Sequence, residues 1–167
     1  MRELRLAAAR GRLHGLQVMT FEQLAARLAS GMSQAIDDET LRAVIQEALP
    51  VTALGELDAI KDLPGMVGAA ADTLRKAWRA GVDLQERRDV HPRLASAATL
   101  EEAVLARLPP SMMRPPDIVV AAMQRPSHAR AMFGPIEIVG ITELSPVWRG
   151  LLKALAAHVE VRWNAGP

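Results

Sequence analysis

The sequence predicts a mixed α/β fold that is mainly helical, in which a long helical segment interrupts a partial parallel sheet. Three observations favour this fold. The chain of 167 residues is half apolar but only 3% aromatic, and its many alanines favour close-packed helices. Residues 15–30 join a short apolar run to a helical stripe. Residues 136–163 follow the order strand, helix, strand, which requires parallel pairing of the two strands.

The first of these segments has clear boundary signals. Residues 2–10 predict a short helix that is rich in alanine and broken at Gly11. Residues 15–19 predict a short buried strand, and Thr20 follows as the N-cap of a helix that ends before Gly31. The apolar stripe of that helix has helical spacing and consists of Phe21, Leu24, Ala25 and Leu28.

Prolines, glycines and capping residues divide the next hundred residues into helices. We expect one to begin at Asp37 or Asp38 and stop at Pro50, and a shorter one over residues 54–61. Pro64 is expected at the first position of a helix that ends at Gly81. Two more are expected over residues 92–108, with a possible restart at the capping box Thr99–Glu102, and over residues 115–123.

The last part of the chain changes to strand-like patterning. The β-branched run of residues 136–139 predicts a strand, and Ser145 followed by Pro146 predicts the start of a helix. Residues 158–163 alternate between polar and apolar side chains and predict a final strand. The two strands should pair in parallel through a right-handed crossover.

The composition excludes several classes of function. The net charge is +1, whereas a dedicated nucleic-acid domain is usually much more basic. Without cysteine there is no thiolate nucleophile or cysteine zinc site, and the four histidines lack metal-ligand spacing. The chain has no phosphate-binding loop, dinucleotide fingerprint or nucleophile elbow. We therefore expect no catalytic residue, metal or cofactor, no membrane span, and a cytoplasmic location.

Two features could still carry a function. Arg75 and Arg79 lie beside Trp78 on one helix, and arginine with an aromatic ring can hold single-stranded nucleic acid. Alternatively, Trp78 belongs to the core and Asp72 pairs with Lys76. The second feature is the segment 139–146, at the strand edge where α/β proteins bind ligands. Alternatively, this segment only makes a turn and starts the next helix.

The order of these parts resembles the first helicase-like domain of superfamily-one helicases, and most closely the AddB-type subunit of bacterial AddAB helicase–nucleases. Residues 16–25, with Thr20 and Phe21, are similar to the family's strand-Thr-Phe-x-x-Leu segment. Residues 138–146 are similar to its Gly-aromatic-Thr-Glu-aromatic-Thr-Pro run at the Walker B position, where this chain has Val139, Gly140, Thr142 and Glu143. Residues 1–35 and 132–167 would then form a partial helicase-like core, and residues 36–131 the inserted helical subdomain.

The resemblance implies a role in DNA double-strand-break repair, with single-stranded DNA and an AddA-type helicase subunit as partners. The DNA contacts would be Thr20, Phe21, Arg75 and Arg79. Active helicases carry an Asp-Glu pair at the second segment that holds magnesium and activates water, and this chain lacks it. The family's phosphate-binding loop and its PD-(D/E)XK nuclease are also missing. We therefore expect a non-catalytic internal piece of such a protein, or a truncated reading frame.

Two other interpretations remain open. The first is a small helical protein-interaction module without a nucleic-acid role. It is favoured if the arginines of residues 75–88 are dispersed and paired with neighbouring carboxylates. The second is an enzyme that uses Glu143 together with a histidine, although the sequence offers no obvious partner for it.

Overall fold

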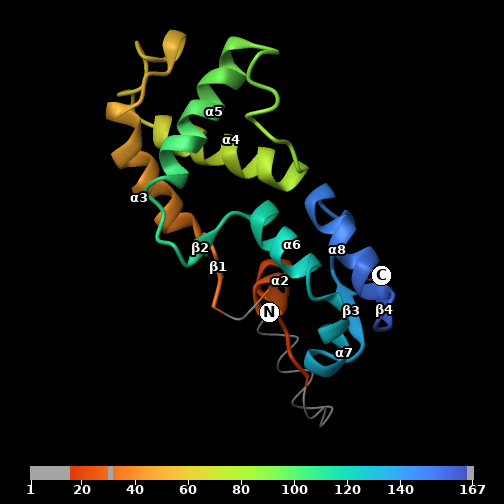
Figure 1. Ribbon diagram of the computed structural model, residues 1–167. Helices are drawn as coiled ribbons and strands as arrows, with labels where there is room; N and C mark the ends of the chain where they lie inside the picture. Colours follow the sequence, from red (N-terminus) through yellow and green to blue (C-terminus); the bar gives the residue numbers. More distant parts are fainter. Residues whose placement is uncertain (1–15, 30–31, 165–167) are drawn as a thin grey trace.

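The structure is a computed structural model that describes residues 16–29 and 32–164, and these residues form mainly helices with two small parallel sheets. Figure 1 shows the elements in chain order. The helices are α2 (Phe21–Ala29), α3 (Asp38–Ala48), α4 (Met66–Ala80), α5 (Pro92–Leu105), α6 (Pro115–Met123), α7 (Ala129–Met132) and α8 (Pro146–Ala156). The strands are β1 (Gln34–Ala35), β2 (Met112–Met113), β3 (Ile136–Val139) and β4 (Val161–Asn164), and short 3-10 turns cover 49–51, 55–57 and 126–128.

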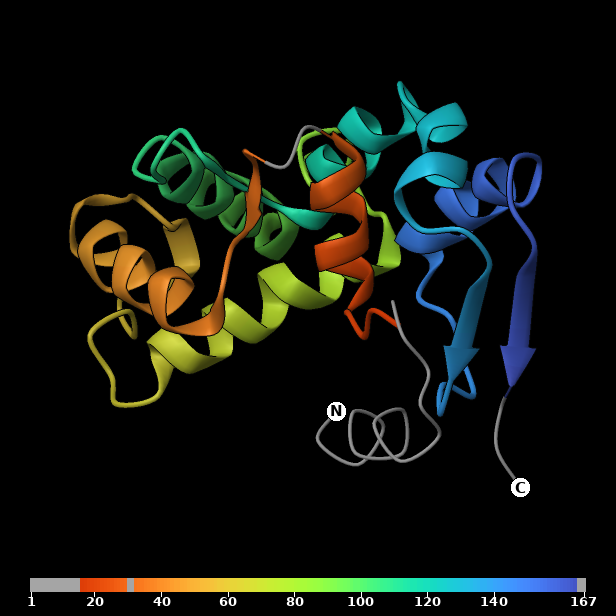
Figure 2. The ribbon, with the colours of Figure 1, turned by 90° about the horizontal axis from the view of Figure 1, so that it is seen from below.

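The described residues pack around two hydrophobic cores. The helical core lies between α3, α4 and α5, and its buried side chains include Leu41, Ile45, Leu74, Trp78 and Val104. The α/β core lies between α2, α6, α8 and β3, and its buried side chains include Leu28, Ile118, Trp148, Leu151 and Leu155. Both views place the helices of the first core at one end of the molecule and α8, β3 and β4 at the other (Figures 1 and 2).

Most helix boundaries follow the capping signals of the sequence. Asp37 is the N-cap of α3, and its carboxylate accepts a hydrogen bond from the Thr40 backbone N–H at 2.8 Å. Gly81 ends α4 in the left-handed conformation, with φ of 67°. Pro92 opens α5 and Pro146 opens α8, both in the first turn. These helices confirm the predictions made from capping residues, glycines and prolines.

Three helix predictions were wrong in detail. Residues 54–61 form a 3-10 turn over Gly55–Leu57 followed by further turns, and Gly55 at its start has a positive φ of 62°. The helix expected to begin at Pro64 begins at Met66, after Gly65 with φ of 90°. The capping box at Thr99 does not restart a helix, because the Thr99 hydroxyl donates to the Ala95 carbonyl within the continuous α5.

The strand–helix–strand unit near the end of the chain is confirmed. Strands β3 and β4 pair in parallel, with Ile136 opposite Val161 and Val139 opposite Asn164, and α8 connects them. Strand β4 begins three residues later than predicted. The backbone N–H groups of His158 and Val159 still donate to the Leu155 carbonyl at 2.9 Å, which closes the end of α8.

The strand expected over residues 15–19 is wrong for the part that the structure describes. Residues 16–20 are irregular, and Leu16 is 54% exposed. A strand forms where a neighbouring strand can pair with it, and no described strand pairs with these residues. Instead, β1 and β2 form a two-residue parallel pair that the sequence did not indicate. Gly15 and the helix expected over residues 2–10 lie outside the described residues.

Candidate functional site

Residues 16–25, the first motif that resembles the helicase family, include the N-terminal cap of α2. The Thr20 hydroxyl accepts a hydrogen bond from the Gln23 backbone N–H at 3.2 Å, and the Gln23 side chain accepts one from the Thr20 backbone N–H at 3.1 Å. This reciprocal arrangement is a capping box, which satisfies two backbone groups at the start of α2. Thr20 remains exposed.

Phe21 has a packing role that the sequence did not indicate. Its ring stacks on Trp148 of α8, with ring centroids 5.9 Å apart and an interplanar angle of 21°. Trp148 is 3% exposed, and Phe21 is half-buried against the α/β core. The contact therefore joins the first motif to the helix that follows the second motif. It also leaves the Phe21 ring partly covered, so this ring offers little free surface to a DNA base.

The second motif forms the end of β3 and the loop before α8. Val139 is the last residue of β3, and Gly140 turns the chain with φ of 70°. Thr142 and Glu143 are exposed in this loop. Within the described residues, Glu143 forms no ion pair and no group of three potential ligand side chains could hold a metal ion.

Arg75 is held by two carboxylates. Its guanidinium donates to Asp38 at the start of α3 and to Asp72 one turn earlier on α4. The expected Asp72–Lys76 pair is therefore replaced by an Asp72–Arg75 pair at i, i+3 spacing. Because Arg75 already has two anionic partners, it has little free capacity for a phosphate group.

A buried polar network connects the two cores. Trp78 is 1% exposed, and its indole N–H donates to the Glu101 carboxylate at 2.5 Å. Glu101 is itself 1% exposed, and the same oxygen accepts from Arg114 Nη1 at 2.7 Å. Arg114 also donates to Asp117 at 2.7 Å. These contacts join α4 and α5 to the first turn of α6.

The negative charges of Asp117 and Glu101 stabilise the positive charge of Arg114 in this network. Burial by itself would lower the pKa of the Arg114 guanidinium. However, its hydrogen bond to Asp117 and the negative charges of Asp117 and Glu101 outweigh burial, and the pKa is raised. The second oxygen of Glu101 has no hydrogen-bond partner among the described residues. Trp78 is thus a core residue, as the alternative interpretation of the sequence held, and it cannot stack on a base.

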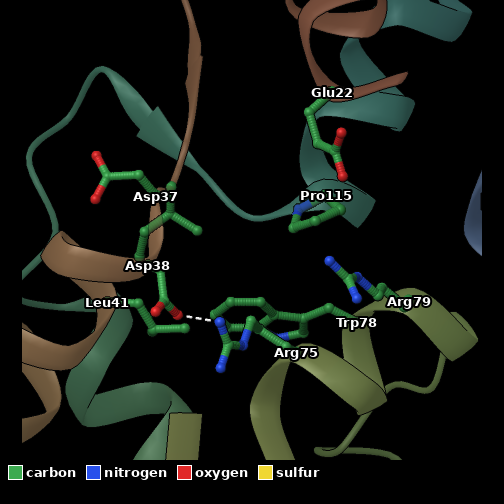
Figure 3. Close-up of a pocket in the computed structure, with 9 residues that line it drawn as sticks. Glu22, Asp37, Asp38, Leu41, Arg75, Trp78, Arg79 and Pro115 are labelled. Carbon is green, nitrogen blue, oxygen red and sulfur yellow. Dashed lines mark hydrogen bonds and ion pairs between the residues drawn. The ribbon is translucent and has the colours of Figure 1, made fainter. Parts of the chain in front are cut away.

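A small cavity lies where the two cores meet. Its volume is about 120 Å³, and it is lined by α2, α3, α4, the residues just before α3, and the first residue of α6. Trp78 and Leu41 form part of its apolar lining, and Pro115 closes one side (Figure 3). The charged lining consists of Glu22, Asp37, Asp38, Arg75 and Arg79.

Arg79 and Glu22 face this cavity from opposite cores. Figure 3 shows the Arg79 side chain extending from α4 toward Pro115, while the Glu22 carboxylate points toward the same region from α2. Neither side chain forms an ion pair with another described residue. Arg79 therefore lies near the first turn of α2, whose N-cap is Thr20. Of the predicted site residues, Arg75 and Arg79 both line this cavity, but Arg75 is paired with two carboxylates. Val139–Glu143 lie in a separate loop.

Replacing Asp37 with alanine should destabilise α3 by about 1 kcal/mol, because the N-cap hydrogen bond is lost. The backbone N–H and hydroxyl of Thr40 lower the pKa of Asp37. A lowered pKa means that the carboxylate stabilises the fold above its unfolded pKa of about 4 and loses this effect as the pH falls through the folded value. Urea unfolding at pH 7 and at pH 3 should show a smaller difference between the two proteins at pH 3. Asp37→Asn, which retains a capping oxygen, should stay near the wild type at pH 7.

No protein-family model, curated protein or solved structure matches this chain. No helix among the described residues is long and apolar enough to cross a membrane.

Proposed function

We propose that the chain is a non-catalytic, helicase-like segment of a DNA double-strand-break repair helicase–nuclease of the AddB type, and that it contacts single-stranded DNA beside the cavity between α2 and α4. One observation carries the DNA contact. Arg79 forms no ion pair with another described residue, and it faces the cavity that Glu22 of α2 also lines. A guanidinium without a carboxylate partner can donate to a phosphate group.

The other features of the segment favour a scaffold role. The strand–helix–strand unit of β3, α8 and β4 pairs in parallel, as a helicase-like sheet would. The loop after β3 carries Glu143 but no Asp-Glu pair, so it lacks the groups that hold magnesium and activate water in active helicases. The Phe21–Trp148 stack ties this unit to the helix of the first motif. An AddA-type helicase subunit is the protein partner that this assignment implies.

The alternative function is a protein-interaction module without a nucleic-acid role. The pairing of Arg75 with Asp38 and Asp72 favours it, because the guanidinium is already neutralised. Glu22 beside Arg79 also repels phosphate. These charges limit any DNA contact to very few phosphate groups, so the proposed binding is weak and depends on Arg79.

Replacing Arg79 with alanine should weaken binding to a single-stranded oligonucleotide by roughly tenfold at low salt, since one charge-assisted phosphate contact is lost. Arg75→Ala is the matched control on the same helix and should have a much smaller effect, because Arg75 is held by two carboxylates. Fluorescence anisotropy of a labelled oligonucleotide measures both. Equal effects of the two substitutions, or no effect of either, would reject Arg79 as the contact.

A further inference from the structure

One end of the molecule carries an exposed apolar segment between α3 and α4. Val51 is 70% exposed, Ile60 is 41% exposed and Leu63 is 57% exposed. Residues 50–65, here called the acidic tip, therefore present large apolar side chains to solvent at the far end of the helical core (Figure 1). Exposed apolar side chains that gather in one segment mark interaction surfaces more often than isolated ones do.

The charge of the acidic tip is negative. Glu56 and Asp62 are exposed and form no ion pair with another described residue. The only basic residue in this segment, Lys61, forms an ion pair with Asp58 at 3.3 Å and donates to the carbonyls of Pro50 and Thr52. Lys61 therefore connects the two ends of this segment, and no described cation pairs with Glu56 or Asp62.

A second surface has the opposite charge. Residues 118–132, here called the basic face, contain no aspartate or glutamate, but they contain Arg125 and Arg130. Val120 is 63% exposed and Met123 is 40% exposed, and their i, i+3 spacing places them on the same side of α6. Met132, at the end of α7, is also 40% exposed.

The arginines of the basic face form no ion pair with another described residue. Arg125 donates to the Ala29 carbonyl at 3.2 Å, which leaves its positive charge without a carboxylate. Arg130 is exposed and has no ion pair among the described residues. Asp117, the acidic residue in the first turn of α6, is engaged by Arg114. The basic face thus combines uncharged apolar side chains with uncompensated guanidinium groups.

We propose that the chain associates with a second copy of itself, with the acidic tip of one molecule docked on the basic face of the next. Each surface combines exposed apolar side chains with one sign of charge, and the two signs are complementary. In both views residues 50–65 lie well apart from α6 and α7, with α3, α4 and α5 on the side of the acidic tip (Figures 1 and 2). The two surfaces therefore meet only between copies, and the contact is head-to-tail, which extends into a ring or an open chain. This association is independent of the proposed contact with DNA.

Analytical ultracentrifugation of the whole chain over a range of concentrations tests the proposal. The average mass should rise with concentration at low salt and fall again when salt is added, because charges at an interface are screened. The double variant Glu56→Lys with Asp62→Lys should associate at least roughly tenfold more weakly, because like charges then face each other. Arg130→Glu should weaken association in the same direction.

An equal mixture of these two variants should associate again. In the mixture, the unaltered acidic tip of the Arg130→Glu variant meets the unaltered basic face of the other variant, so that the two charges are again complementary. Glu86→Lys with Asp89→Lys, in the exposed turn before α5, is the control with the same change in charge, and it should behave like the wild type. Circular dichroism confirms that each variant is folded.

Two results would overturn the proposal. One is a wild-type chain that stays monomeric at every concentration at low salt. The other is association that the charge-reversed variants do not weaken, or that their mixture does not restore. Neither result bears on the DNA contact, because Arg79 belongs to neither surface.

Discussion

Replacing Arg114 with methionine should destabilise the protein by about 3–5 kcal/mol, because the substitution leaves Glu101 as a buried carboxylate without a cation. Glu101 is 1% exposed and accepts hydrogen bonds only from Arg114 and Trp78 among the described residues. Methionine keeps most of the volume of the side chain, so the lost charge pair dominates the effect. Urea unfolding followed by circular dichroism measures the free energy of unfolding.

The matched control for Arg114 is Arg107→Met. Arg107 is exposed in the turn just after α5, and its guanidinium donates only to the Ala103 carbonyl of that helix. This change should alter stability by no more than about 0.5 kcal/mol. If both substitutions cost the same, the buried pair contributes nothing specific, and the connection between the two cores must depend on other contacts.

Replacing Trp148 with alanine should cost about 3–5 kcal/mol, because it removes a large buried ring and leaves a cavity in the α/β core. Trp148 is 3% exposed and stacks on Phe21, so the substitution also removes the contact between α2 and α8. Thermal unfolding and urea titration measure the loss. Hydrogen exchange should show reduced protection in α2 as well as α8.

Trp163→Ala is the control for Trp148. Trp163 lies on β4 and is 45% exposed, so its removal leaves no enclosed cavity. The change should cost much less than Trp148→Ala, about 1 kcal/mol or below. A Trp148 variant that is as stable as the Trp163 variant would contradict the role assigned to the Phe21–Trp148 stack.

Helices with strong local signals could be predicted from the sequence. A capping carboxylate fixed the start of α3, a left-handed glycine fixed the end of α4, and prolines fixed the starts of α5, α6 and α8. These signals act over a few residues, so they do not depend on the rest of the fold. The strand predicted from the apolar run at residues 16–19 does not form, because a strand needs a neighbouring strand with which to pair.

The contacts between distant segments could not be predicted. Arg75 pairs with Asp38, which lies 37 residues earlier, and Trp78 donates to Glu101, which lies 23 residues later. The sequence placed Trp78 correctly on an apolar stripe, but it gave no sign that a buried glutamate would accept from its indole. It also placed Arg79 beside Trp78 on one helix, while the cavity that both residues line depends on how the two cores meet.

The salt dependence of binding to single-stranded DNA tests the proposed function most directly. The folded wild-type chain should bind an unstructured oligonucleotide at low salt and lose affinity as salt rises. With one or two phosphate contacts, log Kobs should fall against log salt with a slope of about −0.7 to −1.4. A folded chain that shows no binding at low salt would contradict the DNA contact and favour the protein-interaction module.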